Sequence, residues 1–272
     1  MLEINKIHQG DCLEVMKDIP DKSVDMILCD LPYGTTACSW DEIIPFNKLW
    51  QQYKRIIKDN GAIVLFGSEP FSSMLRLSNL ENYKYDLIWD KKLPVGHLIA
   101  KKRPLQRTES ISIFSEGTMT NGSKRNMPYY PQMEKREKKR KFINDIKRTS
   151  SELVNKHKFR DDYKRDDYVY RYPTNILVFT NADRRKIHPT QKPVALFEYL
   201  IKTYSNEEDL ILDNCAGSGT TGVACKNLKR NFILIEKEEK YINIIKNRLS
   251  QTTQIQPIML NNNKKEKNNG KK

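Results

Sequence analysis

Residues 210–236 read LILDNCAGSGTTGVACKNLKRNFILIE, which is a short apolar run, a glycine-rich turn, a helix-length segment and a second apolar run. Short apolar runs beside turn residues are typical of buried strands, so this stretch predicts a strand, turn, helix and strand in succession. Glu236 ends the second run, 23 positions after Asp213 ends the first. A carboxylate at that place accepts hydrogen bonds from ribose hydroxyls. The stretch therefore predicts an α/β fold whose parallel sheet binds a nucleoside.

The spacing of the glycines narrows the class of ligand. The turn does not follow the G-x-G-x-x-G pattern, and no Lys-Ser or Lys-Thr pair follows it, which disfavours a dinucleotide or a triphosphate. A short Gly-Ser-Gly turn fits a cofactor without pyrophosphate, such as S-adenosylmethionine. The alternative is that Gly217 and Gly219 are permissive hinges in a tight turn and nothing more.

A second candidate site follows the apolar run of residues 24–29, where the chain continues Asp30, Leu31, Pro32, Tyr33. The run has the length and composition of a buried strand, and ligands bind at the carboxyl ends of strands in open α/β sheets. Pro32 fixes its own φ and favours an extended residue before it, which holds the Asp30 carboxylate and the Tyr33 ring in a rigid relation. That pair suits a planar base with an amino group. The alternative is a strand-end turn without chemistry.

The rest of the chain alternates further strands and helices. Strands are expected over residues 4–7, 62–66, 85–89, 110–114 and 176–179, and helices within residues 13–16, 45–60, 69–80 and 193–201. Asn60 and Gly61 are expected to end the second helix. Residues 34–41 predict a loop of small residues that can close over a substrate. Residues 91–107 predict a basic loop, which either holds phosphates or is a solvated connector.

The formal net charge of +14 is unevenly distributed. Residues 121–171 carry sixteen Lys or Arg against eight Asp or Glu, and residues 261–272 carry five Lys against one Glu, so the two segments supply +12. A polyanion is then contacted by particular segments; the alternative is a solvated loop and a solubilising tail. Residues 116–171 also interleave aromatic and basic side chains, as surfaces that grip nucleic acid do.

Several classes of protein are disfavoured. No apolar run reaches the roughly eighteen residues of a membrane span, and the amino terminus lacks the features of a signal peptide. Five cysteines without a secretory signal indicate reduced thiols in a cytosol, and the absence of a C-x-x-C pair disfavours structural zinc. Cys29 is a candidate nucleophile, but a strand-buried thiol without a basic neighbour is expected to be inert.

Three motifs together resemble the amino-methyltransferases of DNA in their circularly permuted β group. They are Asp-Leu-Pro-Tyr-Gly-Thr-Thr at residues 30–36, His-Pro-Thr-Gln-Lys-Pro at 188–193 and Asp-x-x-x-Gly-Ser-Gly-Thr-Thr at 213–221. They stand in the order of that group, with a target-recognition segment after the first. The resemblance covers about residues 3–249. It implies a Rossmann-like methyltransferase sheet, mostly parallel with one antiparallel strand.

The resemblance implies transfer of a methyl group from S-adenosylmethionine to N6 of an adenine flipped out of duplex DNA. Asp30 and a backbone carbonyl of Leu31 or Pro32 would accept the two amine N–H bonds, and Tyr33, helped by Trp40, would stack on the base. Leu31 replaces the Pro of the family. Because that position offers mainly its backbone, activity is expected to survive the change.

The residues implied to bind the cofactor come from both halves of the chain. They are Asp11, Cys12, Asp30, His188, Thr190, Gln191, Lys192, Asp213, Asn214, Cys215, Ala216, Gly217, Ser218, Gly219, Thr220, Thr221 and Glu236. By resemblance, residues 213–221 wrap the methionine part, Glu236 binds the ribose, Asp11 the adenine edge, and Lys192 lies near the carboxylate. Asn214-Cys215 replaces the commoner Pro-Phe and is expected to alter cofactor affinity. No metal is implied.

The segments follow from the motif order. Residues 1–115 form the catalytic half, 116–171 the target-recognition insertion, 172–249 the cofactor-binding half, and 250–272 an Asn/Lys-rich tail expected to be disordered. Expected partners are duplex DNA and no membrane, with room for a homodimer and a restriction endonuclease, in the cytoplasm of a bacterial or phage-infected cell.

Three alternatives stay open. Cytosine N4 methylation uses the same fold, although by resemblance Asp at position 30 favours adenine. An RNA base or a protein glutamine amide as acceptor leaves the basic, aromatic insertion less well explained. A DNA-binding subunit without catalysis is disfavoured by the intact motifs.

Overall fold

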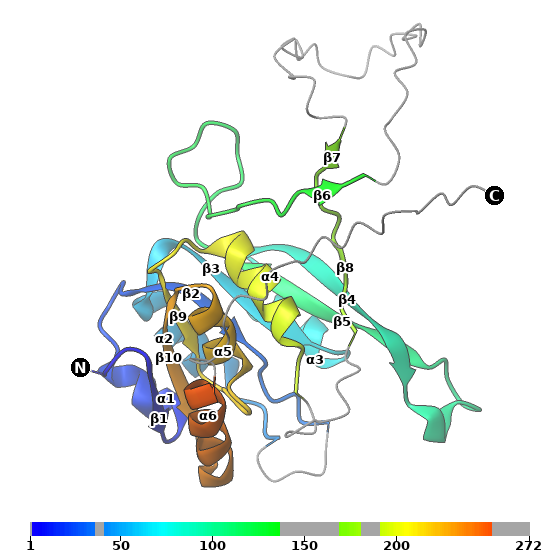
Figure 1. Ribbon diagram of the computed structural model, residues 1–272, viewed down its shortest axis with the longest axis horizontal. Coiled ribbons are helices and arrows are strands. Elements are labelled where there is room, and N and C mark those ends of the chain that lie inside the picture. Colours follow the sequence, from blue (N-terminus) through cyan, green and yellow to red (C-terminus); the bar gives the residue numbers. More distant parts are fainter. Residues whose placement is uncertain (1, 36–40, 137–168, 181–190, 252–272) are drawn as a thin grey trace, which may run out of the picture.

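The computed structural model describes residues 2–35, 41–136, 169–180 and 191–251 (Figure 1). Over these ranges the chain forms an eight-stranded sheet in the order β1-β10-β9-β2-β3-β5-β4-β8. Within it β5 pairs antiparallel with both β3 and β4, and the other pairs are parallel. The expected fold class, α/β with a mostly parallel sheet and one antiparallel strand, is confirmed.

The strands of the sheet are, in sheet order, β1 (Lys6–Gln9), β10 (Asn231–Glu236), β9 (Leu210–Asp213), β2 (Val24–Cys29), β3 (Ile57–Gly67), β5 (Gln106–Phe114), β4 (Tyr83–Val95) and β8 (Ile176–Val178). The α-helices are α1 (Cys12–Val15), α2 (Phe46–Ile56), α3 (Phe71–Leu77), α4 (Val194–Tyr204), α5 (Thr220–Asn227) and α6 (Glu239–Gln251). Short 3-10 turns, η1 (Met16–Asp18) and η2 (His97–Ile99), follow α1 and β4. Among the described helices, none has the length and apolar content that crossing a bilayer requires.

Helices cover both faces of the sheet. On β3, Val64 and Phe66 pack into the core cluster that also contains buried residues of α4, α5 and α6. The intervening Ile63 and Leu65 pack into a second cluster with buried residues of α2 and α3. Successive side chains of a strand point to opposite faces, so this alternation builds a three-layer molecule. Figure 1 shows α4, α5 and α6 together on the near face.

The centre of the sheet is a topological switch point. From β2 the chain passes through α2 to β3 on one side, and from β9 it passes through α5 to β10 on the other side. Because β2 and β9 are neighbours, the connections leave a crevice at their carboxyl ends, where ligands bind in open α/β sheets. Asp30 and Asp213 stand at these two ends.

The expected end of the helix over residues 45–60 is wrong. Helix α2 ends at Ile56, and Ile57 already has the extended dihedrals of β3. Gly61 lies inside β3, opposite an irregularity in the pairing of β2 with β3. A Cβ on Gly61 would lie 2.8 Å from the backbone oxygen of Asp25. Gly61 is therefore required by the close approach of two strands rather than by a helix stop.

The expected basic loop over residues 91–107 is shorter in the structure, where it covers residues 96–105. Strand β4 continues to Val95 and β5 begins at Gln106, so the two form an antiparallel ribbon that projects from the sheet with η2 at its tip (Figure 1). Arg107 holds the ribbon together by a bidentate pair with Asp90, at 2.6 Å for both bonds. Cross-strand pairing thus overrides the polar composition of this segment.

The inserted segment leaves the sheet after β5 and returns at β8. Its described parts include the antiparallel pair β6 (Glu134–Lys135) and β7 (Tyr170–Arg171), which lies apart from the main sheet (Figure 1). An ion pair at 2.6 Å joins Glu134 to Arg171. Residues 137–168, like the tail from residue 252, lie outside the described residues.

Candidate active site

A cavity of about 560 Å³ opens at the carboxyl ends of the parallel strands. Its lining brings together the segments that end β1, β2, β9 and β10 with part of the ribbon. Asp30 and Asp213 both line it, although they are 183 positions apart in the sequence. The volume lies within the range of small-molecule sites. The two sequence motifs therefore share one cavity.

Most of the residues expected to bind the cofactor line this cavity. They are Asp11, Cys12, Asp30, Gln191, Lys192, Asp213, Asn214, Cys215, Ala216, Gly217, Ser218, Thr220 and Glu236, beside the catalytic-motif residues Leu31, Pro32 and Tyr33. His188 and Thr190 lie outside the described residues, as does Trp40. The described residues contain no group of His, Cys, Asp and Glu suited to a metal ion.

Glu236 is fixed by backbone N–H groups at the end of β10. Gly217 donates its N–H to Oε2 at 2.8 Å, and Glu238 donates its N–H to Oε1 at 2.9 Å. Burial raises the pKa of Glu236 above its ordinary value. The carboxylate and the glycine-rich turn are thus held in one fixed arrangement at the cavity wall.

Asp213 ties the end of β9 to the first turn of α5. It is 3% exposed and accepts hydrogen bonds from the N–H of Cys215 and from the hydroxyl of Thr221. Burial raises the pKa of Asp213 to about 7. Thr221 does not line the cavity and donates to Asp213, and its expected contact with the cofactor stays a prediction.

Gly219 is also outside the cavity lining, and its expected contact with the cofactor stays a prediction. Its φ of +76° lies in the left-handed region, and a Cβ there would lie 2.9 Å from side-chain carbons of Ile245 on α6. Gly219 is therefore needed for the start of α5 and for the packing of α6 on it.

Asp11 lines the cavity and also caps α1. Its Oδ1 accepts a hydrogen bond from the N–H of Leu13 at 2.9 Å, which is the geometry of a helix N-cap.

Cys29 is buried, and burial raises the pKa of its thiol to about 12. Cys29 is thus a protonated structural thiol, in agreement with the expectation that it is inert.

The loop after β2 is organised by Asp41, a residue that the sequence did not single out. Its carboxylate accepts hydrogen bonds from the backbone N–H groups of Tyr33, Gly34 and Thr35, at 2.8, 2.9 and 2.9 Å. Three successive N–H groups converging on one carboxylate fix the backbone of the catalytic motif. A lone Asp after a loop of small residues is a weak signal for such a role.

Asp30 accepts two short hydrogen bonds. The hydroxyl of Tyr33 donates to Oδ1 and the ammonium of Lys192 donates to Oδ2, each at 2.6 Å. Burial raises the pKa of Asp30, and the nearby Lys192 opposes this. Burial also raises the pKa of Tyr33, which keeps its hydroxyl protonated as a donor. The Tyr33 ring packs on Phe71 with centroids 5.0 Å apart.

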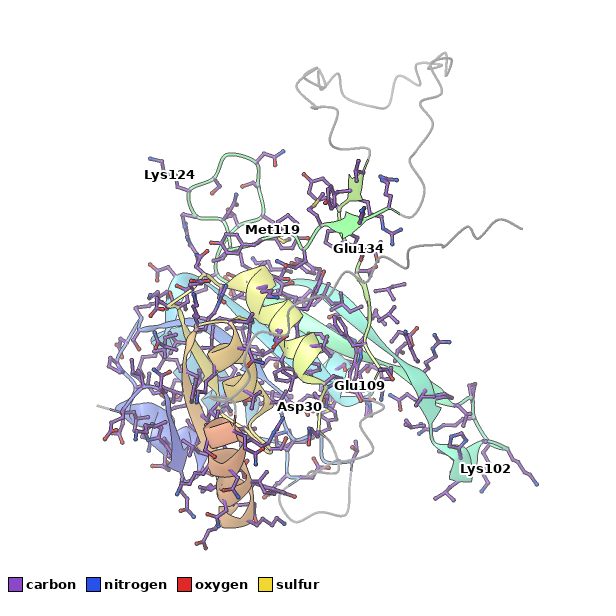
Figure 2. The ribbon with its side chains drawn as sticks, viewed as in Figure 1. Asp30, Lys102, Glu109, Met119, Lys124 and Glu134 are labelled. Atoms are coloured by element: carbon purple, nitrogen blue, oxygen red, sulfur yellow. The ribbon has the colours of Figure 1, made fainter. Side chains whose placement is uncertain are left out.

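Lys192 and Asp30 belong to a larger buried network. Lys192 is 7% exposed, and its Nζ lies 3.4 Å from Oε2 of Glu109, whose Oε1 accepts from Lys91 at 2.7 Å. Figure 2 labels Asp30 and Glu109, the two carboxyl groups that Lys192 contacts. Burial disfavours charge on Lys192, but the carboxylates of Asp30 and Glu109 raise its pKa overall. Burial likewise works against the Glu109 carboxylate, but the two lysines lower its pKa. The network thus holds two cations and two anions.

Sequence reasoning did not find Lys91 or Glu109. Lys91 belongs to the segment that was expected to be a solvent-exposed loop, and Glu109 precedes an apolar run without any motif around it. Both line the cavity because β4 and β5 continue past the edge of the sheet. Their position at the cavity depends on the pairing of β4 with β5, which a local sequence pattern does not predict.

Known proteins are similar to this chain over most of its length. A DNA methylase family model, of the N6/N4 class, matches residues 24–247. The Type II methyltransferase M.HinfI of Haemophilus influenzae is 29% identical over 91% of this chain and 69% of its own length. The Type II methyltransferase M1.MboII of Moraxella bovis is 30% identical over 89% of this chain and 95% of its own length.

Solved structures are similar over nearly the whole chain. The crystal structure of an M1.HpyAVI-SAM complex has a TM-score of 0.58 and 27% identity, and covers 90% of this chain and 98% of its own. The PvuII DNA methyltransferase, titled cytosine-N4-specific, has a TM-score of 0.60 over 91% of this chain and 89% of its own. At 16% identity the latter likeness concerns the fold alone.

Proposed function

The chain belongs to the N6/N4 DNA methylase family, and from this premise we propose that its acceptor is the N6 amino group of an adenine flipped out of duplex DNA. The reaction is amino-methylation of DNA, with S-adenosylmethionine as methyl donor. The observation that carries the proposal is that one cavity holds the Asp30 carboxylate, the Tyr33 ring and the turn between Asp213 and Glu236. A hydrogen-bond acceptor for the amino group and a segment suited to bind a nucleoside thus line the same cavity.

The lining of the cavity fits the cofactor. Asp213, Glu236 and Asp11 place carboxyl groups around the glycine-rich turn, which suits a ligand with a sulfonium charge. We assign residues 213–218 and Glu236 to holding it, and Asp11 to its adenine edge. When bound, the cofactor supplies a methyl group on positively charged sulfur, which is open to attack by a nitrogen lone pair.

Asp30 would make the amino nitrogen of the base a better nucleophile. An exocyclic amine is a poor nucleophile because its lone pair is delocalised into the ring. Asp30 and the backbone carbonyl of Leu31 accept its two N–H bonds, which favours a pyramidal nitrogen with its lone pair directed outward. The nitrogen would form a bond to the methyl carbon as the bond between that carbon and sulfur breaks, which leaves a neutral thioether. The methylated nitrogen would then lose one proton to solvent. The Asp30 carboxylate stabilises the positive charge that develops on the nitrogen meanwhile.

The remaining chemistry is positioning. Tyr33 is packed on Phe71 and presents its ring beside Asp30, so stacking on the flipped base would contribute about 1–3 kcal/mol. Asp41 keeps the backbone of this loop in place. Because no covalent enzyme intermediate is required, the protonated thiol of Cys29 has no part in the reaction.

DNA would be gripped by two segments. We assign base recognition to residues 116–171, between the catalytic half at 1–115 and the cofactor half at 172–249. We assign phosphate contacts to the exposed cations at the tip of the ribbon, Lys101, Lys102 and Arg103. The root of that ribbon carries Lys91 and Glu109, so the tip extends outward from the active site.

The assembly is proposed from the relatives. M.HinfI and M1.MboII are named Type II methyltransferases, which supports a restriction endonuclease of the same specificity as a functional partner. A homodimer on DNA is the assembly that sedimentation of the protein with and without duplex would test.

The test is a methyl-transfer assay with labelled cofactor and duplex DNA, followed by identification of the methylated nucleoside. N6-methyladenine is the expected product. N4-methylcytosine as the product would overturn the proposal that adenine accepts the methyl group. Asp30→Ala is expected to abolish transfer while DNA binding stays close to wild type, because the side chain acts on the amine and not on the phosphates. Sustained turnover by this variant would rule out Asp30 as the amine acceptor.

A further inference from the structure

Both carboxylate oxygens of Asp30 already have donors. Tyr33 donates to Oδ1 and Lys192 donates to Oδ2, each at 2.6 Å. Each oxygen can accept a second hydrogen bond, so an amine can reach Asp30 beside these donors, but a positively charged donor opposes the positive charge that develops on the amine nitrogen during transfer. Lys192 is that donor, so transfer would be favoured if its ammonium moved to another partner.

Glu109 offers such a partner to Lys192. Its Oε1 is held by Lys91, while its Oε2 is buried and has no hydrogen-bond donor among the described residues. This Oε2 lies 3.4 Å from Nζ of Lys192, within ion-pair range but outside hydrogen-bond geometry. A buried carboxylate oxygen without a donor carries an uncompensated desolvation cost, so a closer approach of the ammonium is favourable.

We propose that Glu109 is a positioning residue that receives the Lys192 ammonium when the target amine binds to Asp30. The proposal rests on the proposed function, in which Asp30 is the amine acceptor. Closing 3.4 Å to the roughly 2.8 Å of a charge-assisted hydrogen bond requires a rotation of the terminal bonds of Lys192 and no movement of backbone. Lys91 keeps Glu109 in place during that rotation.

The movement of Lys192 from Asp30 to Glu109 does not change the net charge of the network. Asp30 and Glu109 carry two negative charges, and Lys91 and Lys192 carry two positive charges. The sum is zero whether Lys192 bonds to Asp30 or to Glu109, so no net charge is exposed to the low-dielectric interior. The shift frees the negative charge of Asp30 for the nitrogen on which positive charge develops.

The test is the Glu109→Gln variant in steady-state methyl transfer. Gln keeps the shape and still accepts from Lys91, but it offers no charge to Lys192, which stays on Asp30 and competes with the amine. We expect kcat to fall on the order of 10²-fold, because the Lys192 ammonium stays on Asp30 and opposes the positive charge that develops on the nitrogen. The KM values for DNA and cofactor should stay within about twofold, because neither is bound by Glu109.

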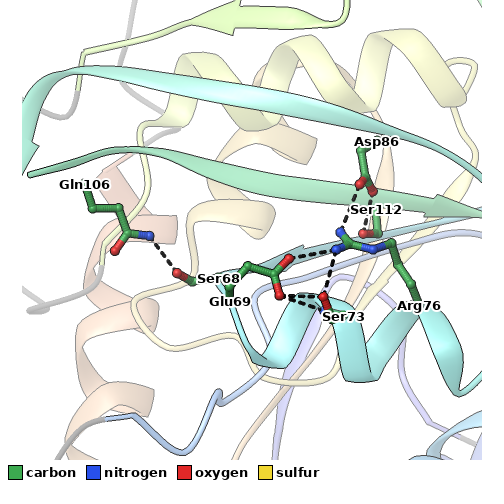
Figure 3. Close-up of polar contacts among 7 residues, drawn as sticks. All are labelled: Ser68, Glu69, Ser73, Arg76, Asp86, Gln106 and Ser112. Carbon is green, nitrogen blue, oxygen red and sulfur yellow. Dashed lines mark hydrogen bonds and ion pairs between the residues drawn. The ribbon is translucent and has the colours of Figure 1, made fainter. Parts of the chain in front are cut away.

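Two further variants separate this role from a structural one. Asp86 is a matched control, since it is a partly buried carboxylate on β4 that pairs with Arg76 at 2.9 Å and with Ser112 at 2.7 Å (Figure 3). Asp86→Asn should lower the melting temperature and leave kcat unchanged. The double variant Lys91→Met/Glu109→Gln removes one charge of each sign, so it avoids a net buried charge and should fold where the single variant fails.

The pH profile gives a readout that a structural role does not move. Lys192 faces Asp30 from the end of β2, Glu109 from β5 and the Tyr33 ring, and Lys91 of β4 lies behind Glu109. Loss of the Glu109 charge lowers the pKa of Lys192, because one of the two carboxylates that raise it is gone. In the Gln variant, kcat should therefore recover as alkaline pH removes the Lys192 proton, where the wild type stays flat.

The outcomes are distinct. Wild-type kcat in both Gln-containing variants, a loss of kcat that Asp86→Asn shares, or a pH profile parallel to wild type would overturn the role of Glu109. Failure of the proposed function is seen separately, in the product of the wild type and in the turnover of Asp30→Ala. A low kcat with unchanged KM and alkaline recovery supports the proposal.

Discussion

Asp213 links the stability of the fold to pH. It is 3% exposed, and burial raises its pKa from 3.8 to about 7. A carboxyl whose pKa is raised in the folded state contributes stability that is complete below 3.8 and is lost as the pH rises through about 7. The free energy of unfolding should therefore fall over this window, at about 1.4 kcal/mol for each unit of pKa difference.

The Asp213→Asn variant tests this coupling. The amide resembles the protonated acid, since its oxygen accepts from Cys215 and its NH₂ donates to Thr221. We expect the variant to be more stable than wild type above pH 7 and to lose less stability between pH 4 and pH 7. Urea unfolding of both proteins across this window measures the difference, in which the other buried carboxyls cancel. Parallel curves would contradict the assigned protonation.

Site residues could be predicted from the sequence where they directly follow a predicted strand. Asp30, Asp213 and Glu236 each follow an apolar run directly, and the structure places all three at one cavity. Glu109 and Lys91 could not be predicted, because their importance comes from partners brought near by the pairing of β4 with β5. The occupation of Asp30 by Lys192 was missed for the same reason, since the pair joins positions 162 apart in the sequence.

At the scale of elements, the proposed contact between DNA and the tip of the β4–β5 ribbon can be tested. If its tip contacts phosphates, replacing Lys101, Lys102 and Arg103 by Ala should weaken binding to all duplexes alike. The slope of log K against log salt should become shallower by about 0.9 for each phosphate that the variant no longer neutralises. Salt-dependent binding of a short duplex measures this, with Lys17→Ala at the opposite edge of the sheet as control. An unchanged slope would favour the solvated-connector alternative.

The existence of elements could be predicted better than their ends. The strand over residues 210–213 and the one over residues 24–29 were expected with the bounds that the structure shows. The ends of the helix after residue 45 and of the loop after residue 91 were placed wrongly, the first because Asn60 and Gly61 were taken as a helix stop and the second because the segment is basic. In both places the pairing of neighbouring strands continues through residues that favour turns when they stand alone.

At the scale of the whole molecule, the proposed recognition segment and the candidate active site lie in separate parts of the chain. The order of motifs was enough to predict an insertion, because polar residues 116–171 interrupt two regular halves. The structure adds that this segment leaves the sheet after β5 and returns at β8, with β6 and β7 paired at its base. The base joins the two ends of the insertion, so the sheet and the cavity do not depend on residues 137–168 for a connection.

Replacing residues 137–168 by a linker of about four Gly and Ser residues should therefore preserve the fold and remove base recognition. The linker can close because Arg136 donates its N–H to the carbonyl of Val169 at 2.8 Å, so the flanking residues are already neighbours. The replaced segment carries eleven Lys or Arg against seven Asp or Glu, so DNA affinity should fall as well. We expect near-wild-type thermal stability and cofactor binding, with methylation spread over adenines in many sequence contexts. Maps of methylated sites, compared with wild type at equal total methylation, measure this; an unchanged target sequence would place recognition elsewhere in the chain.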